Sequence, residues 1–214
     1  MSTLLKIILL GCLSVSAFAG EEVKLDEIKV ATDKPALARG AEGLMNNCHS
    51  CHTMKYIKYR DLLSLGIDKT KVDGWRGDAS LDTPVLAQMS EADDMATFAK
   101  VPPDLSLMAE ARDGGSSYVY SYLIGYYMKP DGMLGNHVFP ETKMPDPLGI
   151  SSAADAAQRT EMQNTAKDIV SFLTWAADPH QGDRTQLGYY VIVYLVLLTG
   201  LLYLVKKQVW AKLK

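Results

Sequence analysis

The chain has 214 residues, of which 48% are hydrophobic and 22% charged, and its formal net charge at pH 7 is −3. This length and composition fit one domain of ordinary size with appendages. Between residues 21 and 184, 25 acidic residues face only 17 basic ones, a net charge of −8. Such a domain should attract basic partners and not nucleic acid, although an acidic surface that only maintains solubility would show the same excess.

The first 19 residues have the pattern of a secretory signal peptide. A lysine precedes an apolar run that ends on Ala17-Phe18-Ala19, a small-x-small cleavage pattern. We predict a signal peptide over 1–19, cleaved after Ala19. A first membrane-spanning helix is the alternative, but the run is shorter than the roughly 20 residues that a bilayer needs and no basic residues follow it. A faint resemblance to a lipoprotein cleavage box would instead make Cys12 a lipidated residue.

The next feature is a segment that opens at Pro35 and leads straight into a pair of cysteines. Its apolar residues recur at helical spacing, and Gly40 and Gly43 offer places where a second helix could approach closely. Another apolar stripe at helical spacing covers 160–177 and stops at Asp178-Pro179. The segment from Pro35 resembles the first helix of class I cytochromes c, and the stripe over 160–177 is similar to the terminal helix that crosses it. We therefore predict a mostly α, class I cytochrome c-like haem domain with long loops.

The cysteine pair carries the strongest chemical signal in the chain. Without the signal peptide, Cys48 and Cys51 are the remaining cysteines, and they stand in the sequence Cys48-His49-Ser50-Cys51-His52. C-x-x-C-H is the attachment signature of c-type haem, in which two thiols bond the porphyrin and the histidine coordinates iron. We predict one covalently bound haem c. A thioredoxin-type disulfide would need a βαβ setting where the surroundings are helical in pattern, and closed structural zinc requires four ligands.

The second axial ligand to the iron must come from further along the chain. Met144 is the preferred candidate, because the prolines at 145 and 147 stiffen its loop and remove competing backbone donors. His137 is the competing candidate. A vacant distal position is the third possibility, and it would suit a haem-based sensor or a peroxidase-like protein. The other methionines in this part of the chain are predicted to fill the core: Met89, Met108, Met128 and Met133.

The C-terminal run over 187–205 contains 19 residues without a charge, which roughly matches the hydrocarbon core of a bilayer. We predict a transmembrane anchor helix over 185–206. Four lysines follow the run closely, whereas Arg184 alone lies close before it. Positive charge stays on the cytoplasmic side, so 207–214 is predicted to be a cytoplasmic tail. The haem domain, 20–184, then lies on the periplasmic side of a bacterial inner membrane.

Further motifs extend along nearly the whole mature chain and carry a family resemblance. They are Met54-Lys55-Tyr56, Tyr59-Arg60-Asp61-Leu62, Pro102-Pro103-Asp104-Leu105-Ser106, Ala111-Arg112-Asp113-Gly114-Gly115, Tyr118-Val119-Tyr120, Gly125-Tyr126, the Met144-Pro145 loop, Ala166-Lys167-Asp168-Ile169 and Phe172-Leu173-Thr174-Trp175-Ala176-Ala177. With the single anchor, they resemble the cytochrome c1 family, the haem subunits of the ubiquinol:cytochrome c oxidoreductase. The attachment motif is shared by every c-type cytochrome, whereas the Pro-Pro-Asp-Leu-Ser and Trp-Ala-Ala blocks in this order are specific.

The resemblance implies roles for individual residues and for partners. It implies that Met144 is the distal ligand, that Arg112 lies near a haem propionate, and that Tyr118 and Pro103 pack at the haem. A guanidinium is also a good permanent partner for a propionate carboxylate, although Arg112 could equally be a solvated helix-end arginine. The implied partners are cytochrome b and a Rieske iron-sulfur protein in a membrane complex, with a cytochrome c as electron acceptor.

The implied function is electron transfer without catalysis by this chain alone. In this interpretation the chain takes electrons from the Rieske protein and passes them to the cytochrome c. The alternatives are a membrane-anchored monohaem cytochrome of another respiratory enzyme and a haem-based sensor with an open distal site. On the acidic face, Glu91, Asp93 and Asp94 form the tightest cluster, and we predict that this cluster guides a basic cytochrome c.

Overall fold

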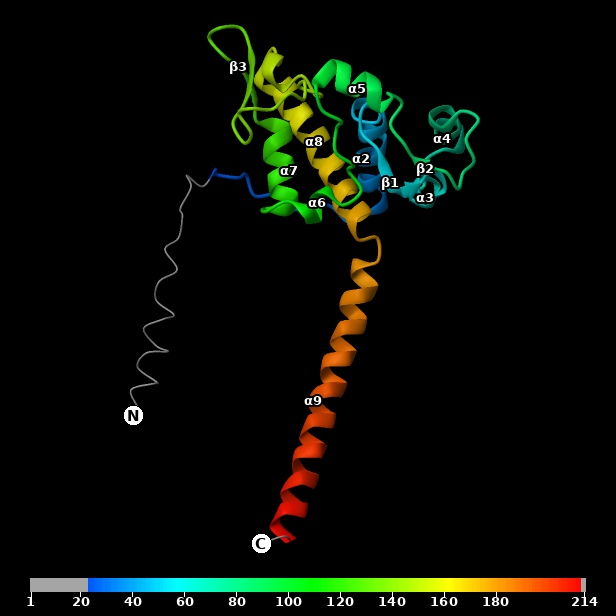
Figure 1. The fold of residues 1–214 in the computed structure, drawn as a ribbon, viewed down its shortest axis with the longest axis vertical. Coiled ribbons are helices and arrows are strands. Elements are labelled where there is room, and N and C mark those ends of the chain that lie inside the picture. The colour runs from blue at the N-terminus through cyan, green and yellow to red at the C-terminus, as the bar shows by residue number, and fades with distance from the viewer. Residues whose placement is uncertain (1–22, 213–214) are drawn as a thin grey trace, which may run out of the picture.

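The computed structural model describes residues 23–212, which form a helical head and one long helix that projects from it (Figure 1). The predicted signal peptide over 1–19 lies outside the described residues. The elements in chain order are α2 (Lys34–Asn47), β1 (Met54–Lys58), α3 (Tyr59–Ser64), α4 (Lys69–Arg76), β2 (Pro84–Val85), α5 (Glu91–Phe98), α6 (Met108–Ala111), α7 (Gly115–Ile124), β3 (Tyr126–Met128), β4 (Leu134–Asn136), the 3-10 turn η1 (Ile150–Ser152), α8 (Ala156–Ala177) and α9 (Gln181–Lys212).

Helices α2 and α8 cross at the centre of the head, as the two apolar stripes predict (Figure 1). The crossing depends on small residues in α2. A Cβ atom added at Gly40 would lie 2.0 Å from the carbonyl oxygen of Asp168, and one at Gly43 would lie 3.0 Å from Ile169. The two backbones therefore meet at a distance that only glycine permits at position 40.

Aspartate caps set the start of both helices. The Asp33 carboxylate accepts a hydrogen bond from the Ala36 amide at 3.0 Å, and Pro35 occupies the first turn of α2. The Asp155 carboxylate does the same for the Gln158 amide at 2.8 Å. Helix α8 begins at Ala156, four residues before the predicted start at 160. Its first turn, residues 156–159, is exposed and adds nothing to the hydrophobic stripe, so the stripe did not reveal it.

The core lies between these helices and α7. Its largest fully buried side chains include Leu44 of α2, together with Ile169 and Phe172 of α8. The prediction that the other methionines fill this core is wrong for Met128 and Met133, whose side chains are 57% and 58% exposed. Both lie at the β3–β4 hairpin, which projects from the head at the edge of the core (Figure 1). Met89 and Met108 are partly buried.

Two small antiparallel sheets complete the head. Strand β1 pairs with β2, and β3 pairs with β4 in the register Tyr126–Asn136, Tyr127–Gly135 and Met128–Leu134. Between β1 and β2 the chain makes an excursion through α3 and α4. The sequence analysis predicted helices and long loops and named no strand, because strands of two to five residues are too short for a visible alternating pattern.

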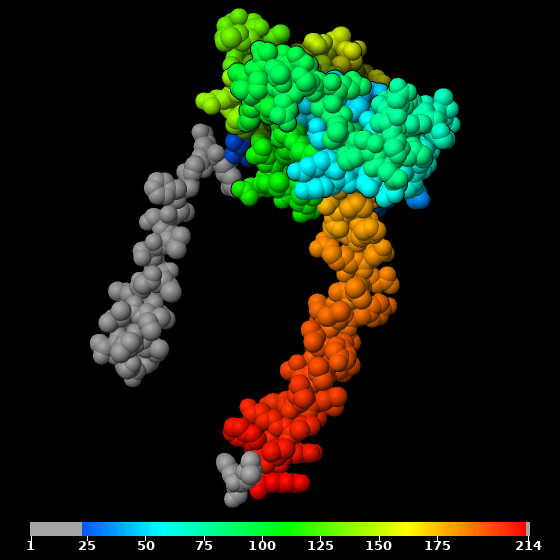
Figure 2. All heavy atoms as spheres, turned by 45° about the vertical axis from the view of Figure 1, so that its right-hand side comes forward, coloured from blue at the N-terminus to red at the C-terminus, as the bar shows by residue number. Residues whose placement is uncertain are grey.

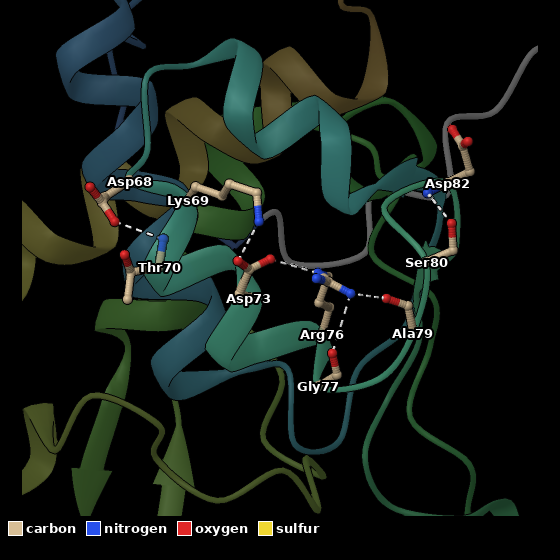
Figure 3. A network of polar contacts seen from close by, with 9 residues as sticks. All are labelled: Asp68, Lys69, Thr70, Asp73, Arg76, Gly77, Ala79, Ser80 and Asp82. Carbon is tan, nitrogen blue, oxygen red and sulfur yellow. Dashed lines mark hydrogen bonds and ion pairs between the residues drawn. The ribbon is translucent and has the colours of Figure 1, made fainter.

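A polar network shapes the excursion around α4 (Figure 3). Asp68 caps the helix by accepting from the Thr70 amide at 2.7 Å, and Asp73 pairs with Lys69 at 2.5 Å and with Arg76 at 2.8 Å. The Arg76 guanidinium also donates to the carbonyl oxygens of Gly77 and Ala79. The chain turns at Gly77, whose φ of 54° is one that glycine adopts easily, and the bonds from Arg76 hold the turn that follows the helix.

Helix α9 leaves the head and stands free of it, which the space-filling view shows clearly (Figure 2). None of its residues is buried in the described structure, and its exposed side chains are mostly Leu, Val and Tyr. Among the described residues, α9 is the one helix that is long and apolar enough to cross a membrane. The helix extends beyond the predicted anchor over 185–206 at both ends.

Candidate functional site

A cavity of about 510 Å³ opens in the head between the end of α2, the chain around α5 and α6, helix α7, and the segment 137–149. This volume is within the range of about 300–1,000 Å³ that small-molecule and cofactor sites occupy. The lining is predominantly apolar and includes the seven residues that the sequence analysis assigned to the haem site: Cys48, Cys51, His52, Pro103, Arg112, Tyr118 and Met144. Segments that lie far apart in the sequence thus converge on one site.

The two cysteines lie on a helical turn that continues directly from α2. The Cys48 amide donates to the Leu44 carbonyl at 2.8 Å, and the His52 amide donates to the Cys48 carbonyl at 2.9 Å. Both thiols are free. Burial, followed by the neighbouring Cys51, raises the pKa of Cys48 to about 12, so Cys48 is a neutral thiol here. Strand β1 follows and pairs antiparallel with β2, so this stretch is not the parallel βαβ unit of a thioredoxin.

His52 is nearly buried and held through one ring nitrogen. Its Nδ1 lies 2.8 Å from the carbonyl oxygen of Pro103. Because a carbonyl only accepts, Nδ1 carries the proton and Nε2 keeps a free lone pair. Burial lowers the pKa of His52, which favours the neutral imidazole. A neutral imidazole whose second nitrogen donates to a carbonyl is the usual arrangement of a metal-ligating histidine.

The Pro103 carbonyl is itself fixed by the two residues that follow Pro103. The Leu105 amide donates to the Thr53 carbonyl at 2.8 Å, and the Lys55 amide donates to the Asp104 carboxylate at 3.0 Å. These bonds fasten the Pro-Pro-Asp-Leu-Ser block to the residues directly after His52. The orientation of the imidazole is therefore set by two segments about 50 positions apart, which no local pattern in the sequence reveals.

Arg112 lies directly after α6, exposed at the edge of the cavity. Its guanidinium carbon is 6.0 Å from the centre of the Tyr118 ring, so the two cavity residues stack in a cation–π contact. Lys100 and Lys143 also line the cavity. The sequence analysis missed both lysines as site residues, although Lys143 stands next to Met144. Together with Arg112 they supply three cationic groups around one apolar cavity.

The candidate distal residues are clearly separated in the structure. Met144 lines the cavity on the segment 137–149, which contains no helix or strand. His137 is exposed, does not line the cavity, and stacks on the Tyr127 ring with 4.2 Å between ring centres. After Met144, the Asp146 carboxylate accepts from the amides of Leu148, Gly149 and Ser151, and this turn ends the segment.

The acidic cluster predicted on α5 is only partly a surface feature. Glu91 and Asp93 are exposed, whereas Asp94 is 2% exposed and shares the inner face of the helix with Phe98, four residues later. The prediction that Asp94 belongs to an exposed docking cluster is therefore wrong. Helix α5 packs on the head through the side that carries Asp94 and Phe98, so Glu91 and Asp93 alone of the three remain exposed.

The residues present fit a haem. The cavity is apolar and of suitable size, two free thiols lie one helical turn apart beside it, and an imidazole presents a free Nε2. Its charged lining is net positive, with Lys100, Arg112 and Lys143 against the single carboxylate of Glu141, which suits a cofactor that carries carboxylates. Among the described residues no cluster of three or more His, Cys, Asp or Glu side chains could hold a bare metal ion. That result leaves the zinc alternative without a site in this part of the chain.

Fold and cavity define the class of the protein: a helical domain that presents a C-x-x-C-H motif to an apolar cofactor cavity and continues into an apolar C-terminal helix. The model of the Cytochrome C1 family matches residues 24–88 and 76–213. Cytochrome c1 of Allochromatium vinosum is 32% identical, over 83% of this chain and 84% of that protein. The chain belongs to the cytochrome c1 family.

Two other similarities cover even more of the chain. The ammonia monooxygenase gamma subunit of Nitrosomonas europaea is 28% identical over 92% of each protein. A solved structure of a hyperthermophilic respiratory Complex III contains a chain with the same fold, with a TM-score of 0.55, 22% identity and 99% coverage of both chains. The predicted fold class, a mostly helical haem domain with a C-terminal apolar helix, is confirmed.

Proposed function

We propose that the protein is the electron-transfer haem subunit of a membrane-bound quinol:cytochrome c reductase. The observation that carries the proposal is the convergence of His52, Met144 and the two cysteines on one apolar cavity, in a chain of the cytochrome c1 family. In this function the protein takes single electrons from a Rieske iron-sulfur protein and passes them to a cytochrome c. It catalyses no reaction on its own.

Each cavity residue has a distinct part in holding one haem c. Cys48 and Cys51 would form the thioether bonds, and Nε2 of His52 and the sulfur of Met144 would be the axial ligands. Arg112, with Lys100 and Lys143 beside it, would neutralise the propionates, and Tyr118 and Pro103 would pack against the ring. When bound, the haem supplies a one-electron couple. Support comes from the position of all these side chains at the cavity.

The protein's own contribution is to tune that couple. Pro103 holds His52 in one tautomer and one orientation, and the apolar lining keeps water away from the ligands. A histidine and methionine pair poises haem iron at a relatively high potential, which suits an electron carrier late in a respiratory chain. Met144 lines the cavity and would fill the distal position, which opposes the alternative of a sensor with an open position.

The membrane arrangement follows from α9. We propose that residues 185–206 anchor the protein in a bacterial inner membrane, with the lysines after the apolar run on the cytoplasmic side and the head in the periplasm. A signal peptide over 1–19 would export the head to the same side. Cytochrome b and the Rieske protein are the proposed partners in the membrane complex, which the resemblance in fold to a Complex III chain supports.

The second candidate function is that of a monohaem cytochrome subunit in another membrane enzyme. The observation that favours it is the similarity, along 92% of the chain, to a protein named as an ammonia monooxygenase subunit. The two functions place the same haem domain beside different partners. They are therefore separated by the identity of the proteins that bind the chain and not by its haem chemistry.

The test is purification of the full chain, carrying an affinity tag, from detergent-solubilised membranes. We expect haem that stays on the chain in a denaturing gel, a far-red sulfur-to-iron absorption band in the oxidised protein, and copurification of a di-haem cytochrome b and a Rieske protein. A chain without covalent haem would contradict the cofactor assignment. Copurification with a different oxidoreductase, and without cytochrome b, would contradict the proposed complex in favour of the second candidate.

A further inference from the structure

Four polar contacts form a closed ring that starts and ends at the backbone of Met144. The Met144 amide donates to the Thr142 hydroxyl at 3.2 Å, and the Thr142 and Tyr122 hydroxyls lie 2.5 Å apart. The Tyr126 hydroxyl donates its one proton to the Met144 carbonyl oxygen at 3.2 Å, and it also lies 3.2 Å from the Tyr122 hydroxyl. We call these four residues the Met144 ring. Both polar groups of the Met144 backbone are thus satisfied by side-chain hydroxyls.

The tyrosines of the Met144 ring stand on regular structure. Tyr122 belongs to α7 and Tyr126 is the first residue of β3, and their aromatic rings meet edge to face with centres 5.7 Å apart. Tyr126 is 1% exposed. Burial, followed by the hydrogen bond to Tyr122, raises the pKa of Tyr126, so its hydroxyl remains a neutral donor over the whole physiological range.

The backbone of Met144 has little else to fix it. The segment 137–149 contains no helix or strand, so it lacks the ladder bonds that hold regular structure. Its first residues are held by the buried Asn136, whose side chain donates to the Tyr122 carbonyl and accepts from the amides of Val138 and Phe139. Its last residues are held by Asp146. The His137 amide also donates to the Gly125 carbonyl at 3.0 Å, at the start of the segment. The Met144 ring is a further attachment, and it acts at Met144 itself.

We propose that Tyr126, acting through the Met144 ring, is a positioning residue that holds Met144 at the distal side of the haem cavity. The inference rests on the proposed function, in which Met144 is the axial ligand. Thioether sulfur is a weak ligand, so its occupancy of an iron depends on how well the protein holds it in place. Loosening the backbone of Met144 therefore raises the fraction of time that the distal position is open.

Tyr126→Phe tests the proposal in the full-length, haem-loaded protein in detergent. Thr142→Val is the second variant, because it removes the hydroxyl that accepts from the Met144 amide and keeps the β-branched shape. Both should bind cyanide in the oxidised state about five to ten times faster than the parent, the size expected from the loss of one hydrogen bond. Their midpoint potentials and far-red bands should fall as well. These readouts report on ligation and not on electron-transfer activity.

Two matched variants separate ligation from stability. Tyr59→Phe removes a hydroxyl from another buried tyrosine that does not line the cavity, and it should bind cyanide at the parent rate. Thr142→Ser keeps the hydroxyl and should bind cyanide more slowly than Thr142→Val. Parent-like cyanide binding and potential in both Tyr126→Phe and Thr142→Val would overturn the proposal. An increase of the same size in Tyr59→Phe would overturn it too, because the effect would then follow stability.

The Met144→Leu variant distinguishes this failure from failure of the proposed function. If Met144→Leu loses the far-red band while Tyr126→Phe and Thr142→Val behave as the parent, only the role of the Met144 ring is wrong. If Met144→Leu itself keeps the band and the potential, Met144 is not the ligand, and the assignment of the distal site and the inference from the ring both fail.

Discussion

At the scale of single residues, the attachment motif is held in place by the head, including its spacer residues. His49 is 2% exposed, and its Nε2 donates to the Leu86 carbonyl at 2.8 Å. The Met89 amide donates to the Ser50 carbonyl at 2.9 Å. Burial lowers the pKa of His49, which keeps this ring neutral. Two hydrogen bonds therefore hold the motif against the segment that follows β2, and they fix the position of its helical turn beside the cavity.

The first prediction concerns the two thiols. Replacing Cys48 or Cys51 by Ala should leave the haem attached through one bond or lost, because each thioether fixes one vinyl position. Haem staining of a denaturing gel, normalised to the amount of chain, measures this directly. Ser50→Ala, between the two cysteines, serves as the control and should stain as the parent does. A full-strength band in both cysteine variants would mean that the haem is held without these bonds.

The second prediction concerns the distal ligand. Met144→Leu keeps the volume and apolar character of the side chain but deletes the sulfur, so packing should survive while the midpoint potential falls sharply. Redox titration and the far-red band of the oxidised protein are the measurements. His137→Phe is the matched control, since it preserves a ring to stack on Tyr127 and should leave both unchanged. The reverse pattern would make His137 the ligand.

At the scale of elements, the crossing of α2 and α8 places the cysteine turn against the core. Gly40 meets the backbone of Asp168 and the side chain of Phe172, so α8 lies against the face of α2 that leads into the attachment motif. The helices also bring Ile169 and Leu173 of α8 into the cavity lining. A shift between these two helices would therefore disturb both the stability of the head and the geometry of the site.

The third prediction tests this contact through glycines. Gly40→Ala should lower the free energy of unfolding by about 2–3 kcal/mol, because its Cβ would overlap a backbone oxygen that has nowhere to move. Gly74→Ala is the control, since Gly74 lies in helix α4 with no atom within 4 Å of an added Cβ. It should raise stability by about 0.5–1 kcal/mol through helix propensity. Denaturant unfolding of the haem-loaded chain measures both.

A loss of stability of similar size in Gly40→Ala and Gly74→Ala would contradict the close crossing. Gly43→Ala provides an intermediate case, because its added Cβ would lie 3.0 Å from Cγ1 of Ile169, a side-chain atom and not a backbone atom. We expect a loss between those of the other two variants. The order of the three stabilities is thus set by what each Cβ meets and not by the residue type.

At the scale of the whole molecule, the protein is an acidic head carried on a long apolar helix (Figure 2). The net charge of −8 between residues 21 and 184 gives the head a field that attracts basic partners. Because Asp94 is buried, Glu91 and Asp93 are the exposed acidic residues at the start of α5. Phe98, at the other end of this helix, lines the cavity. The same short helix therefore carries the two exposed carboxylates at its start and a cavity residue at its end.

The fourth prediction concerns encounter with a basic cytochrome c. Neutralising Glu91 and Asp93 together, to Gln and Asn, should lower the second-order rate of electron transfer at low salt. The difference should vanish as the Debye length shrinks from about 10 Å at 0.1 M salt to about 3 Å at 1 M. Stopped-flow measurements across a salt series follow this rate, and quinol oxidation by the complex should change little.

The matched control removes the same amount of charge elsewhere on the head. Glu27 and Glu161 are exposed and do not line the cavity, so the double change to Gln alters the net charge equally. A rate loss confined to the Glu91 and Asp93 variant would place the encounter near α5. An equal loss in both double variants would show that only the total charge matters, and a rate that is flat with salt would exclude electrostatic guidance.

The sequence by itself determined the features that depend on local physics. The C-x-x-C-H motif indicates a haem site from five consecutive residues. The apolar stripes identify α2 and α8 because a helix repeats every 3.6 residues, and an uncharged run of 19 residues identifies α9 as the apolar helix. The sequence also indicated a close helix contact at α2, because Gly40 and Gly43 have no side chain to keep a second helix away.

Only the tertiary structure decided how distant segments meet. The hydrogen bond between His52 and the Pro103 carbonyl and those of the Met144 ring link residues whose spacing follows no repeat. The burial of Asp94 likewise depends on which side of α5 packs on the head. The physical reason is that a hydrogen bond between segments 18 or 51 positions apart depends on how the whole chain packs, and not on the residues beside it. The ligands could thus be proposed from the motif and the loop, whereas the groups that hold them in place required the fold.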